Sequence, residues 1–486
     1  MNQTADVIIL GAGPAGCCAA IRLADLGKRV ILAERTAFPR PHIGESLSPG
    51  IWNILDYLGV AENIAEGQIL RDLTARVIWE SREPSVIPAE KRGPGVMVDR
   101  ADFDHRLLEA ARQRGVRILQ PARVLTRVRD EDGWALAVQY NGEIIEVKAH
   151  LVLDAMGRHG KSARSRHATA PVTLALWDAA PGSWMPRETR IEALPRGWLW
   201  GSPRPDGSYR VMAFVSPCKV RILGATETMR RLLAQSRLFK PAAESVSHPR
   251  TCSAAPYLDM TPWDEGCIKL GEAAFALDPL SSSGVEKAMR FAMQTVIAVN
   301  TVLADPDALP MAREFYESRF LEAVATHTVW TRNYYAQAWP GGDEVFWREH
   351  AEEPERKAPW PAMIQRFNEA CTRRRRLEEA PVATQPREDA NVLWRLPVQP
   401  SPYLRFVTTP CVVGDIIQPR SAIMHPHLDR PLAYLAGHEI APLLRPVLGR
   451  TTLGSLVREW STRIPGETAA RIAGWLHQKG LLVPLP

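Results

Sequence analysis

A glycine-rich turn between two apolar runs constrains the fold of this chain more than any other feature. Residues 7–10 read VIIL, which is short enough for a buried parallel strand, and residues 11–16 follow as GAGPAG. The helical pattern after the turn stops at Gly27, and a second apolar run, residues 30–33, ends at Glu34. A strand, a glycine turn, a helix, a strand and an acid in this order form the complete fingerprint of a dinucleotide-binding βαβ unit.

Each part of the fingerprint has a physical task. Gly11 permits the tight turn, Gly13 lets the backbone approach a pyrophosphate, and Gly16 lets the helix pack closely on the strand. The N-terminus of the helix faces the phosphates, and Glu34 can accept a hydrogen bond from a ribose hydroxyl. The sequence therefore predicts a dinucleotide site, although the fingerprint alone does not separate FAD from NAD.

Three later segments extend the pattern. Residues 97–118 predict a strand and then a helix, with Asp102 as the N-cap. Residues 122–157 alternate in polarity and turn at DG and NG, which is typical of a β-meander. Residues 267–299 predict a strand, an acidic turn and a helix that opens at Gly284.

In this order the segments resemble the FAD-dependent monooxygenases of the aromatic-hydroxylase type, over about residues 5–350. Glu272 stands where that family usually has Asp, so the acid is kept on a longer side chain. The residues that match the family's three motifs are Gly11, Gly13 and Gly16, then Asp154 and Gly157, then Gly271, Asp278, Pro279 and Gly284.

Four further motifs resemble the flavin-dependent halogenase-like branch of that family. They are PRPHIGES at residues 39–46, GWLWGSP at 197–203, DPLSSSGV at 278–285 and an aromatic segment at 331–347 that ends in FW. In the second motif, strand alternation puts Trp198 and Trp200 on one face, either as core packing or as shielding of a tunnel.

The resemblance implies FAD as the cofactor and identifies the residues around it. The expected catalytic group is Pro279, Ser282, Ser283 and Gly284, where backbone N–H groups and the helix dipole would favour an anionic reduced flavin. The expected cofactor-binding residues are Gly11, Gly13, Pro14, Ala15, Gly16, Glu34, Arg35, Arg40, Ile43, Gly44, Glu45, Ser46, Arg100, Val124, Asp154, Glu272, Asp278, Gly284 and Val285.

Two histidines are candidates for a base by position, His42 and His159, although a lone histidine is more often structural. The seven cysteines have neither metal-ligand spacing nor the pattern of a disulfide framework, so we predict reduced thiols and no metal site. The segment with Arg40 and Glu45-Ser46 is expected to line the flavin as a strap.

Halogenase activity depends on a lysine that follows the G-E-S segment in halogenases. Residues 70–81 contain no lysine, and Thr74 is the nearest match. Ser281 stands where tryptophan halogenases place a Glu. We therefore predict that the fold of this branch is kept while the halogenation chemistry is lost.

The C-terminal region is expected to form a separate module. Residues 378–397 are rich in Pro and charge and predict a linker. Residues 398–486 contain three helical patches and a final apolar strand, and they resemble small winged-helix or peptide-docking modules. The stretch has only a mild basic excess and no Lys/Arg cluster, which argues against nucleic-acid binding. Peptide docking and a structural lid or dimer contact both stay open. The basic run 373–376 predicts a solvated helix face.

These observations predict an α/β chain: a Rossmann-like FAD-binding fold of the aromatic-hydroxylase type, an inserted antiparallel β-sheet substrate domain and a small helical or winged-helix C-terminal domain. The expected boundaries are 1–170 with 260–310 for FAD binding, 171–259 with parts of 45–100 for the substrate domain, 311–377 for a helical region, 378–397 for the linker and 398–486 for docking.

The chain lacks the lysine and carries such a tail. In this it resembles the flavoprotein monooxygenases of tryptophylquinone biogenesis, as in the quinohemoprotein amine dehydrogenase pathway. The resemblance implies hydroxylation of an indole, a peptidyl tryptophan of a partner polypeptide, through a flavin hydroperoxide, with O2 and with electrons from NAD(P)H or a reductase. The alternatives are a small-molecule hydroxylase or halogenase relative and a non-catalytic flavin-binding assembly factor. With no apolar run long enough for a membrane span and no signal-peptide pattern, we expect a cytoplasmic protein.

Overall fold

Two compact units make up the chain. The computed structural model describes residues 3–159, 165–341, 344–353, 361–379, 394–395, 397–447 and 449–485. The first unit comprises residues 1–304 and 316–367, and the second comprises 305–315 and 368–486. Most of the expected linker, 378–397, lies outside the described residues.

A mixed eight-stranded sheet forms the base of the first unit; its main path is β19-β20-β11-β1-β2-β8, and the pairings from β20 to β8 are parallel. The central strand β1 pairs in parallel with β2 on one side and with β11 on the other, so the carboxyl ends of all three meet at one edge. This arrangement confirms the predicted Rossmann-like fold. The strands are β1 Gln3–Leu10, β2 Val30–Ala33, β8 Arg117–Leu119, β11 Glu143–Asp154, β19 Trp263–Asp264 and β20 Cys267–Lys269.

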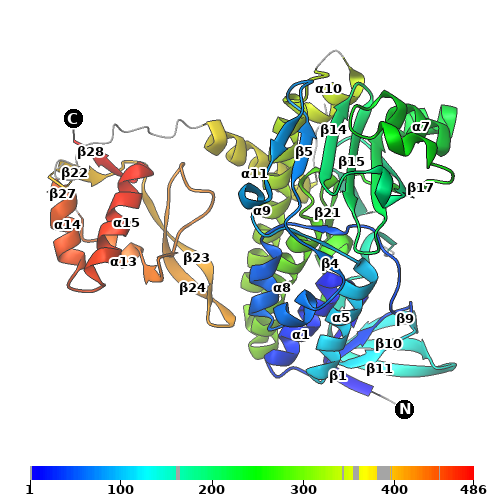
Figure 1. Cartoon of the computed structure of the whole chain (residues 1–486). Coiled ribbons are helices and arrows are strands. Elements are labelled where there is room, and N and C mark those ends of the chain that lie inside the picture. The colour runs from blue at the N-terminus through cyan, green and yellow to red at the C-terminus, as the bar shows by residue number, and fades with distance from the viewer. Residues whose placement is uncertain are drawn as a thin grey trace. The chain divides into compact units, whose positions relative to one another are not determined.

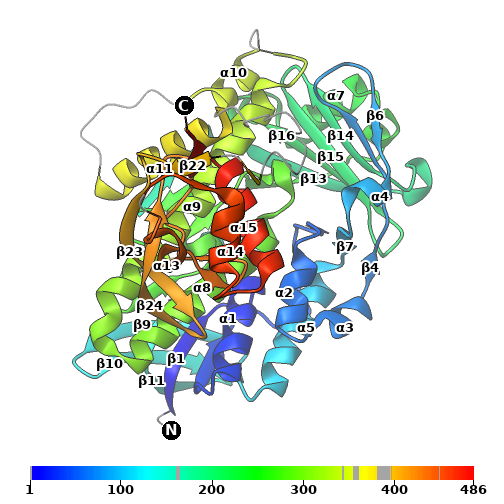
Figure 2. The same cartoon turned by 90° about the vertical axis from the view of Figure 1, so that its left-hand side faces the viewer.

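Three helices of the first unit position the site residues: α1 (Pro14–Asp25), α5 (Arg100–Gln113) and α8 (Gly284–Ala304). Helix α1 contacts both α5 and α8 (Figure 2). The predicted N-cap Asp102 is wrong, because Asp99 takes that position and accepts from the N–H groups of Ala101 and Asp102. The meander of β9 (Ala122–Asp130) and β10 (Gly133–Tyr140) extends from β11, as predicted.

A seven-stranded sheet, ordered β17-β13-β16-β15-β14-β5-β6, forms the upper half of the first unit. Its pairings are antiparallel except for β14 with β5. Figure 1 shows α7 (Ala225–Gln235) on one side of these strands and α9 (Leu309–Ala336) with α10 (Val345–Ala351) on the other. The strands are β5 Ala75–Ile78, β6 Ser85–Ile87, β13 Leu174–Ala180, β14 Thr189–Leu194, β15 Gly197–Pro203, β16 Tyr209–Val215 and β17 Arg250–Ser253.

Aromatic rings cover the face of this sheet that meets α9 and α10. Trp198 and Trp200 are buried in one cluster there, which confirms that they share a face. Trp198 stacks on Phe214 with ring centroids 3.8 Å apart and meets Trp79 edge-on at 6.1 Å. We call the aromatic residues of this cluster the aromatic wall. They are Trp79, Trp198, Trp200, Phe214, Tyr335, Phe346 and Trp347.

Short elements join the sheets. Strands β3 (Ser46–Leu47) and β4 (Ile69–Leu70) both pair with β7 (Val96–Val98). The remaining named elements of the first unit are α2 Ile51–Tyr57, α3 Ala61–Ala65, α4 Ala89–Arg92, α6 Pro217–Leu223, β12 Arg166–Ala168, β18 Tyr257–Asp259 and β21 Phe275–Ala276.

The second unit has its own apolar core, centred on Trp460. Its helices α13, α14 and α15 pack with a small sheet ordered β27-β22-β28, and β23 pairs with β24 as a separate hairpin. Helix α11 carries the basic run 373–376, in which Arg374 pairs with Glu378 and Asp429. The elements are α11 Ala362–Glu379, β22 Pro397–Pro400, β23 Arg405–Val413, β24 Ile416–Met424, β25 Tyr434–Leu435, β26 His438–Glu439, α13 Ala441–Leu444, β27 Thr451–Thr452, α14 Leu453–Trp460, α15 Gly466–Gln478 and β28 Leu482–Pro484.

Two further features bear on the expectations. No helix among the described residues has the length and apolar character needed to cross a bilayer. Of the seven cysteines, only Cys218 on α6 is exposed. The buried ones are Cys17, Cys18, Cys267 and Cys371.

Candidate functional site

The glycine turn after β1 leaves backbone N–H groups open at the start of α1. Gly11 has φ +104°, and a Cβ there would lie 2.5 Å from the carbonyl oxygen of Ala155. A Cβ on Gly16 would lie 2.0 Å from the carbonyl oxygen of Gly11, whereas a Cβ on Gly13 would meet nothing within 4 Å. Within the described part of the chain, no side chain caps the N-terminus of α1. Close packing therefore explains Gly11 and Gly16, and Gly13 borders space that a phosphate can enter.

Glu34 at the end of β2 organises the adjacent edge. One carboxylate oxygen accepts from the Ala12 N–H at 2.8 Å and the other accepts from the Thr36 N–H at 2.9 Å. Each oxygen keeps a further lone pair, so the side chain can also accept from a ligand hydroxyl. The N–H of Ala122 on β9 donates to the Glu34 carbonyl oxygen. The predicted residue Val124 follows two positions after Ala122 on the same strand.

The strap, residues 38–50, is held at three points. Arg100 on α5 donates to the carbonyl oxygen of Ile43 at 2.8 Å and forms a buried ion pair with Asp104. Ser48 donates to Glu286 on α8 at 3.0 Å. The third point is Glu45, which is almost fully buried.

Glu45 ties the strap to the seven-stranded sheet. One of its oxygens accepts from both Nε and Nη2 of Arg210 on β16, at 2.9 and 2.7 Å. Its other oxygen accepts from the Gly44 N–H at 3.1 Å. Arg204 adds a second guanidinium at 3.8 Å. The carboxylate therefore links two parts of the first unit.

The loop between β21 and α8, residues 277–283, carries the expected catalytic group. Asp278 accepts from the Leu280 N–H at 3.0 Å, and Ser282 has φ +49°, a left-handed conformation that costs free energy in a serine. Ser281 hydrogen-bonds to Ser283 at 2.7 Å and to His327 Nε2 on α9 at 2.8 Å. A Cβ on Gly284 would meet nothing within 4 Å, so the start of α8 is open for a ligand.

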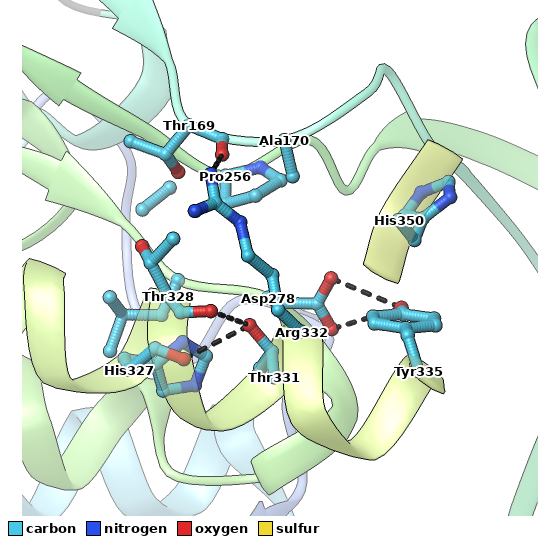
Figure 3. A pocket seen from close by; sticks show the side chains of 12 residues that line it. Thr169, Ala170, Pro256, Asp278, His327, Thr328, Thr331, Arg332, Tyr335 and His350 are labelled. Carbon is cyan, nitrogen blue, oxygen red and sulfur yellow. Dashed lines mark hydrogen bonds between the residues drawn. The ribbon is translucent and has the colours of Figure 1, made fainter. Parts of the chain in front are cut away.

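A chain of hydrogen bonds connects this loop to the aromatic wall. Trp198 Nε1 donates to the hydroxyl of Tyr335 at 3.2 Å, and Tyr335 donates to the carboxylate of Asp278 at 3.1 and 3.3 Å. Figure 3 shows the contact between Tyr335 and Asp278 among the residues that line a small cavity. Burial raises the pKa of Asp278 to about 6.

The chain matches known flavin-binding proteins. A family model described as an FAD binding domain matches residues 4–194. Tryptophan 2-halogenase of Chondromyces crocatus is 29% identical over 343 residues, an alignment that spans 65% of this chain and 65% of the halogenase. The match thus covers just under two thirds of that relative.

Two solved structures match nearly the whole chain. A peptidyl tryptophan dihydroxylase essential for tryptophylquinone cofactor biogenesis, QhpG, has a TM-score of 0.75 at 21% identity, covering 98% of this chain and 100% of its own. The flavin-dependent halogenase CmlS also has a TM-score of 0.75, at 22% identity, covering 99% and 96%.

Residues 4–194 match an FAD binding domain, so we call the chain a flavoprotein, and its sequence is similar to that of a tryptophan halogenase. FAD fits the residues of the flavoprotein, because an uncapped helix N-terminus, an open Gly13 and the acceptor Glu34 stand together at one edge of the parallel sheet.

The structure brings most of the predicted residues of this flavoprotein to the first unit's parallel-sheet edge, strap and loop. Arg40 lies 3.6 Å from Asp104, and Asp154 accepts from the Met156 N–H at the end of β11. Glu272 is paired with Arg158 at 3.1 Å. The residues that lie in the glycine turn, the strap or the loop with α8 are Gly11, Gly13, Pro14, Ala15, Gly16, Arg40, Ile43, Gly44, Glu45, Ser46, Asp278, Pro279, Ser282, Ser283, Gly284 and Val285.

Other predicted residues stand apart. Arg35 is exposed. His42 is exposed; desolvation and then the Arg100 charge lower its pKa, and its Nδ1 lies 2.7 Å from the Ile43 carbonyl oxygen. His159 ends the short helical turn Gly157–His159. Their roles stay predictions.

Three residues of the flavoprotein's site were missed from the sequence: Arg210, His327 and Tyr335. Arg210 is one of many arginines on strands, and nothing local marks it as the partner of Glu45. His327 and Tyr335 lie on α9, four residues before and four residues after Thr331. The aromatic segment 331–347 gave a signal for Tyr335, but the carboxylate it contacts lies 57 residues away.

Proposed function

We propose that this flavoprotein is an FAD-dependent monooxygenase that hydroxylates an indole, the side chain of a tryptophan within a partner polypeptide. The reaction uses O2, with electrons from NAD(P)H or a reductase, and the product is an intermediate in quinone cofactor biogenesis. The likeness in fold to a peptidyl tryptophan dihydroxylase, which extends over both units of the chain, supports a peptidyl substrate. FAD, when bound, supplies the oxygen-activating chemistry.

The observation that carries the choice of hydroxylation is Thr74. The resemblance places the halogenase lysine within residues 70–81, where this chain has none and Thr74 is the nearest match, and a hydroxyl cannot replace an ammonium charge. The carbonyl oxygen of Thr74 accepts from the Thr189 N–H at 2.9 Å, so the residue is fixed in the pairing of β5 with β14. An electron-rich indole needs mainly orientation and exclusion of water, which a hydroxylase can supply without that lysine.

The chain's own residues support these two tasks. Trp198, Trp200 and Phe214 give the sheet a dry apolar face. Bonds from Arg210 to Glu45 and from Arg100 to Ile43 hold the strap in place. The start of α8 directs N–H groups and a positive dipole toward developing negative charge.

The test is a reconstitution with FAD, a reductant, O2 and candidate tryptophan-bearing polypeptides. We expect one tryptophan to gain the mass of one or two oxygen atoms, with the gain dependent on O2 and on reductant, and peptide fragmentation will locate it. Matched polypeptides with Trp→Phe at that site should gain nothing. Turnover of free tryptophan at the same rate as the polypeptide would contradict the peptidyl substrate.

Halogenation is the second candidate, because the curated relative over 65% of the chain is a tryptophan halogenase. Here the guanidinium of Arg92, which donates to the Leu73 carbonyl oxygen at 2.7 Å, would have to supply the missing positive charge. Repeating the reconstitution with bromide decides between the two. A brominated product that disappears in Arg92→Met would support halogenation, whereas an oxygenated product alone supports hydroxylation.

A further inference from the structure

Asp278 is a buried carboxyl group without a basic partner among the described residues. It is 4% exposed, and the ion pairs of the described residues do not include it. Some other buried acids of this unit are paired, as Glu45 is with Arg210 and Asp104 with Arg100. An isolated carboxylate in such a place is costly, so this position favours the protonated form far more than the paired acids do.

The hydrogen bonds around Asp278 have a fixed direction. Trp198 Nε1 can only donate, so the Tyr335 oxygen that it contacts must accept. The Tyr335 proton is then directed to Asp278, whose two oxygens lie 3.1 and 3.3 Å away. The phenol favours the charged carboxylate over the protonated carboxyl, and it thereby opposes the effect of burial.

A cavity of about 10 Å³ adjoins Asp278, and its lining is mostly apolar with a few polar groups. Its size suits about one water molecule. Thr169 lines the cavity and is 1% exposed, and its hydroxyl is buried with no hydrogen-bond partner among the described residues. Arg332, Tyr335 and His350 line it as well (Figure 3). An orphaned hydroxyl and a carboxyl group at one cavity supply the polar contacts that a buried water needs.

The other titratable groups around the cavity do not change charge near neutral pH. Burial lowers the pKa of His327 to about 3, with Lys287 on α8 adding to the effect, and burial lowers the pKa of His350 on α10 to about 4. Burial, followed by the Asp278 charge, raises the pKa of Tyr335 well above its usual value. Arg332 stays a cation, bound to the Thr169 carbonyl oxygen at 3.4 Å. A neutral-pH titration in this cluster thus belongs to Asp278, whose pKa is about 6.

We propose that Asp278, Tyr335 and one water bound at Thr169 form a proton-storage site beside the loop that carries Pro279 and Ser282. Asp278 takes up a solvent proton through this water: a proton from solvent bonds to the water's oxygen while one of the water's own O–H bonds breaks and that proton bonds to a carboxyl oxygen. The water stays neutral and no electrons move. This role rests on the oxygen chemistry of the proposed function, because reduction of O2 to water consumes protons. It does not depend on which ring is oxidised.

The test is an infrared pH titration of the FAD-loaded chain without substrate, following the band of a protonated carboxyl group. We expect one such band that titrates near pH 6 and is absent from Asp278→Asn. In Tyr335→Phe the midpoint should rise by roughly one to two pH units, because the carboxylate loses a donor. Thr169→Val, which removes the water's anchor, should also move the midpoint.

Tyr316→Phe is the matched control. Tyr316 is an equally buried hydroxyl on α9, but it donates to the carbonyl oxygens of Pro262 and Lys269, so the midpoint should stay unchanged. Asp278→Glu, which keeps a carboxyl group, covers the case in which the Asn variant fails to fold. A band that persists in Asp278→Asn would overturn the proposal. So would a midpoint in Tyr335→Phe and Thr169→Val that is unchanged from wild type. Failure to hydroxylate any polypeptide would leave this result untouched, so the two proposals fail separately.

Discussion

The glycines of the first turn differ in the space around them. The Cβ positions on Gly11 and Gly16 lie inside the contact distance of backbone oxygens, while the Cβ position on Gly13 is open. A backbone oxygen cannot move aside as a flexible side chain can. Gly11 and Gly16 are therefore needed by the fold itself, and Gly13 by the ligand.

Gly13→Ala and Gly16→Ala should separate these needs. Gly16→Ala should lower the free energy of unfolding of the FAD-free chain by about 2 kcal/mol or more, because the added methyl group overlaps the Gly11 carbonyl oxygen. Gly13→Ala should leave that stability within about 1 kcal/mol and weaken FAD binding at least tenfold. Denaturant unfolding and flavin fluorescence titration measure the two effects; equal FAD affinity in Gly13→Ala and wild type would refute the assignment.

Asp278 should make stability depend on pH in a direction opposite to that of most acids. Its folded pKa of about 6 lies above the ordinary 3.8, so its favourable contribution is full below the ordinary pKa and is lost as the pH rises through about 6. Relative to Asp278→Asn, the wild-type chain should lose about 3 kcal/mol of unfolding free energy between about pH 3 and about pH 7. Denaturant titrations at several pH values test this, and a constant difference between the two proteins would contradict it.

At the scale of elements, the strap owes its position to partners from three directions. Arg100 comes from α5, Glu286 from α8 and Arg210 from β16. Glu45 and Arg210 are both shielded from solvent, which distinguishes their ion pair from a screened surface pair. The cofactor role of Glu45 predicted from the sequence would then act through the shape of the strap.

Glu45→Ala should cost about 3–5 kcal/mol of unfolding free energy, because it leaves a buried guanidinium without its carboxylate. It should also weaken FAD retention and speed limited proteolysis within residues 38–50. The matched control is Glu83→Ala, whose pair with Arg237 is exposed and should matter by less than about 1 kcal/mol. Unchanged flavin content and protease resistance in Glu45→Ala would remove the strap from the site.

The sequence was informative where a function depends on neighbours in the chain. The glycine turn and Glu34 lie within one βαβ unit, so their spacing alone predicted the dinucleotide edge. Arg210 lies 165 residues from Glu45, and Tyr335 lies 57 residues from Asp278. Such pairs depend on how two sheets and a helix pack, and no local pattern encodes that packing. The N-cap at Asp99 was missed for a smaller reason, since Asp102 offered the same chemistry three residues later.

At the scale of the whole molecule, the two units have separate cores. The core of the second unit is formed by residues between 398 and 482, and Trp460 is nearly inaccessible in it. The residues that fit FAD all belong to the first unit. The stability of the second unit can thus be changed without changing FAD binding by the first unit.

Trp460→Ala should lower the unfolding free energy of the second unit by about 3–5 kcal/mol while FAD content stays at the wild-type level. Its indole N–H also loses the Leu443 carbonyl oxygen as an acceptor. Calorimetry should show one thermal transition moving down and the other unchanged. Loss of bound FAD in this variant would contradict the separation of the cores.

The distribution of cysteines allows one thiol of the first unit to be labelled selectively. Four of the seven cysteines are buried, and Cys218 on α6 is the exposed one. Burial raises the pKa of Cys18 and Cys267, which keeps them protonated and slow toward alkylating reagents. A maleimide dye added briefly should thus react first at Cys218, on the helix that follows β16. Fluorescence from that label would report changes beside the seven-stranded sheet, in the native chain and without engineering a cysteine-free background.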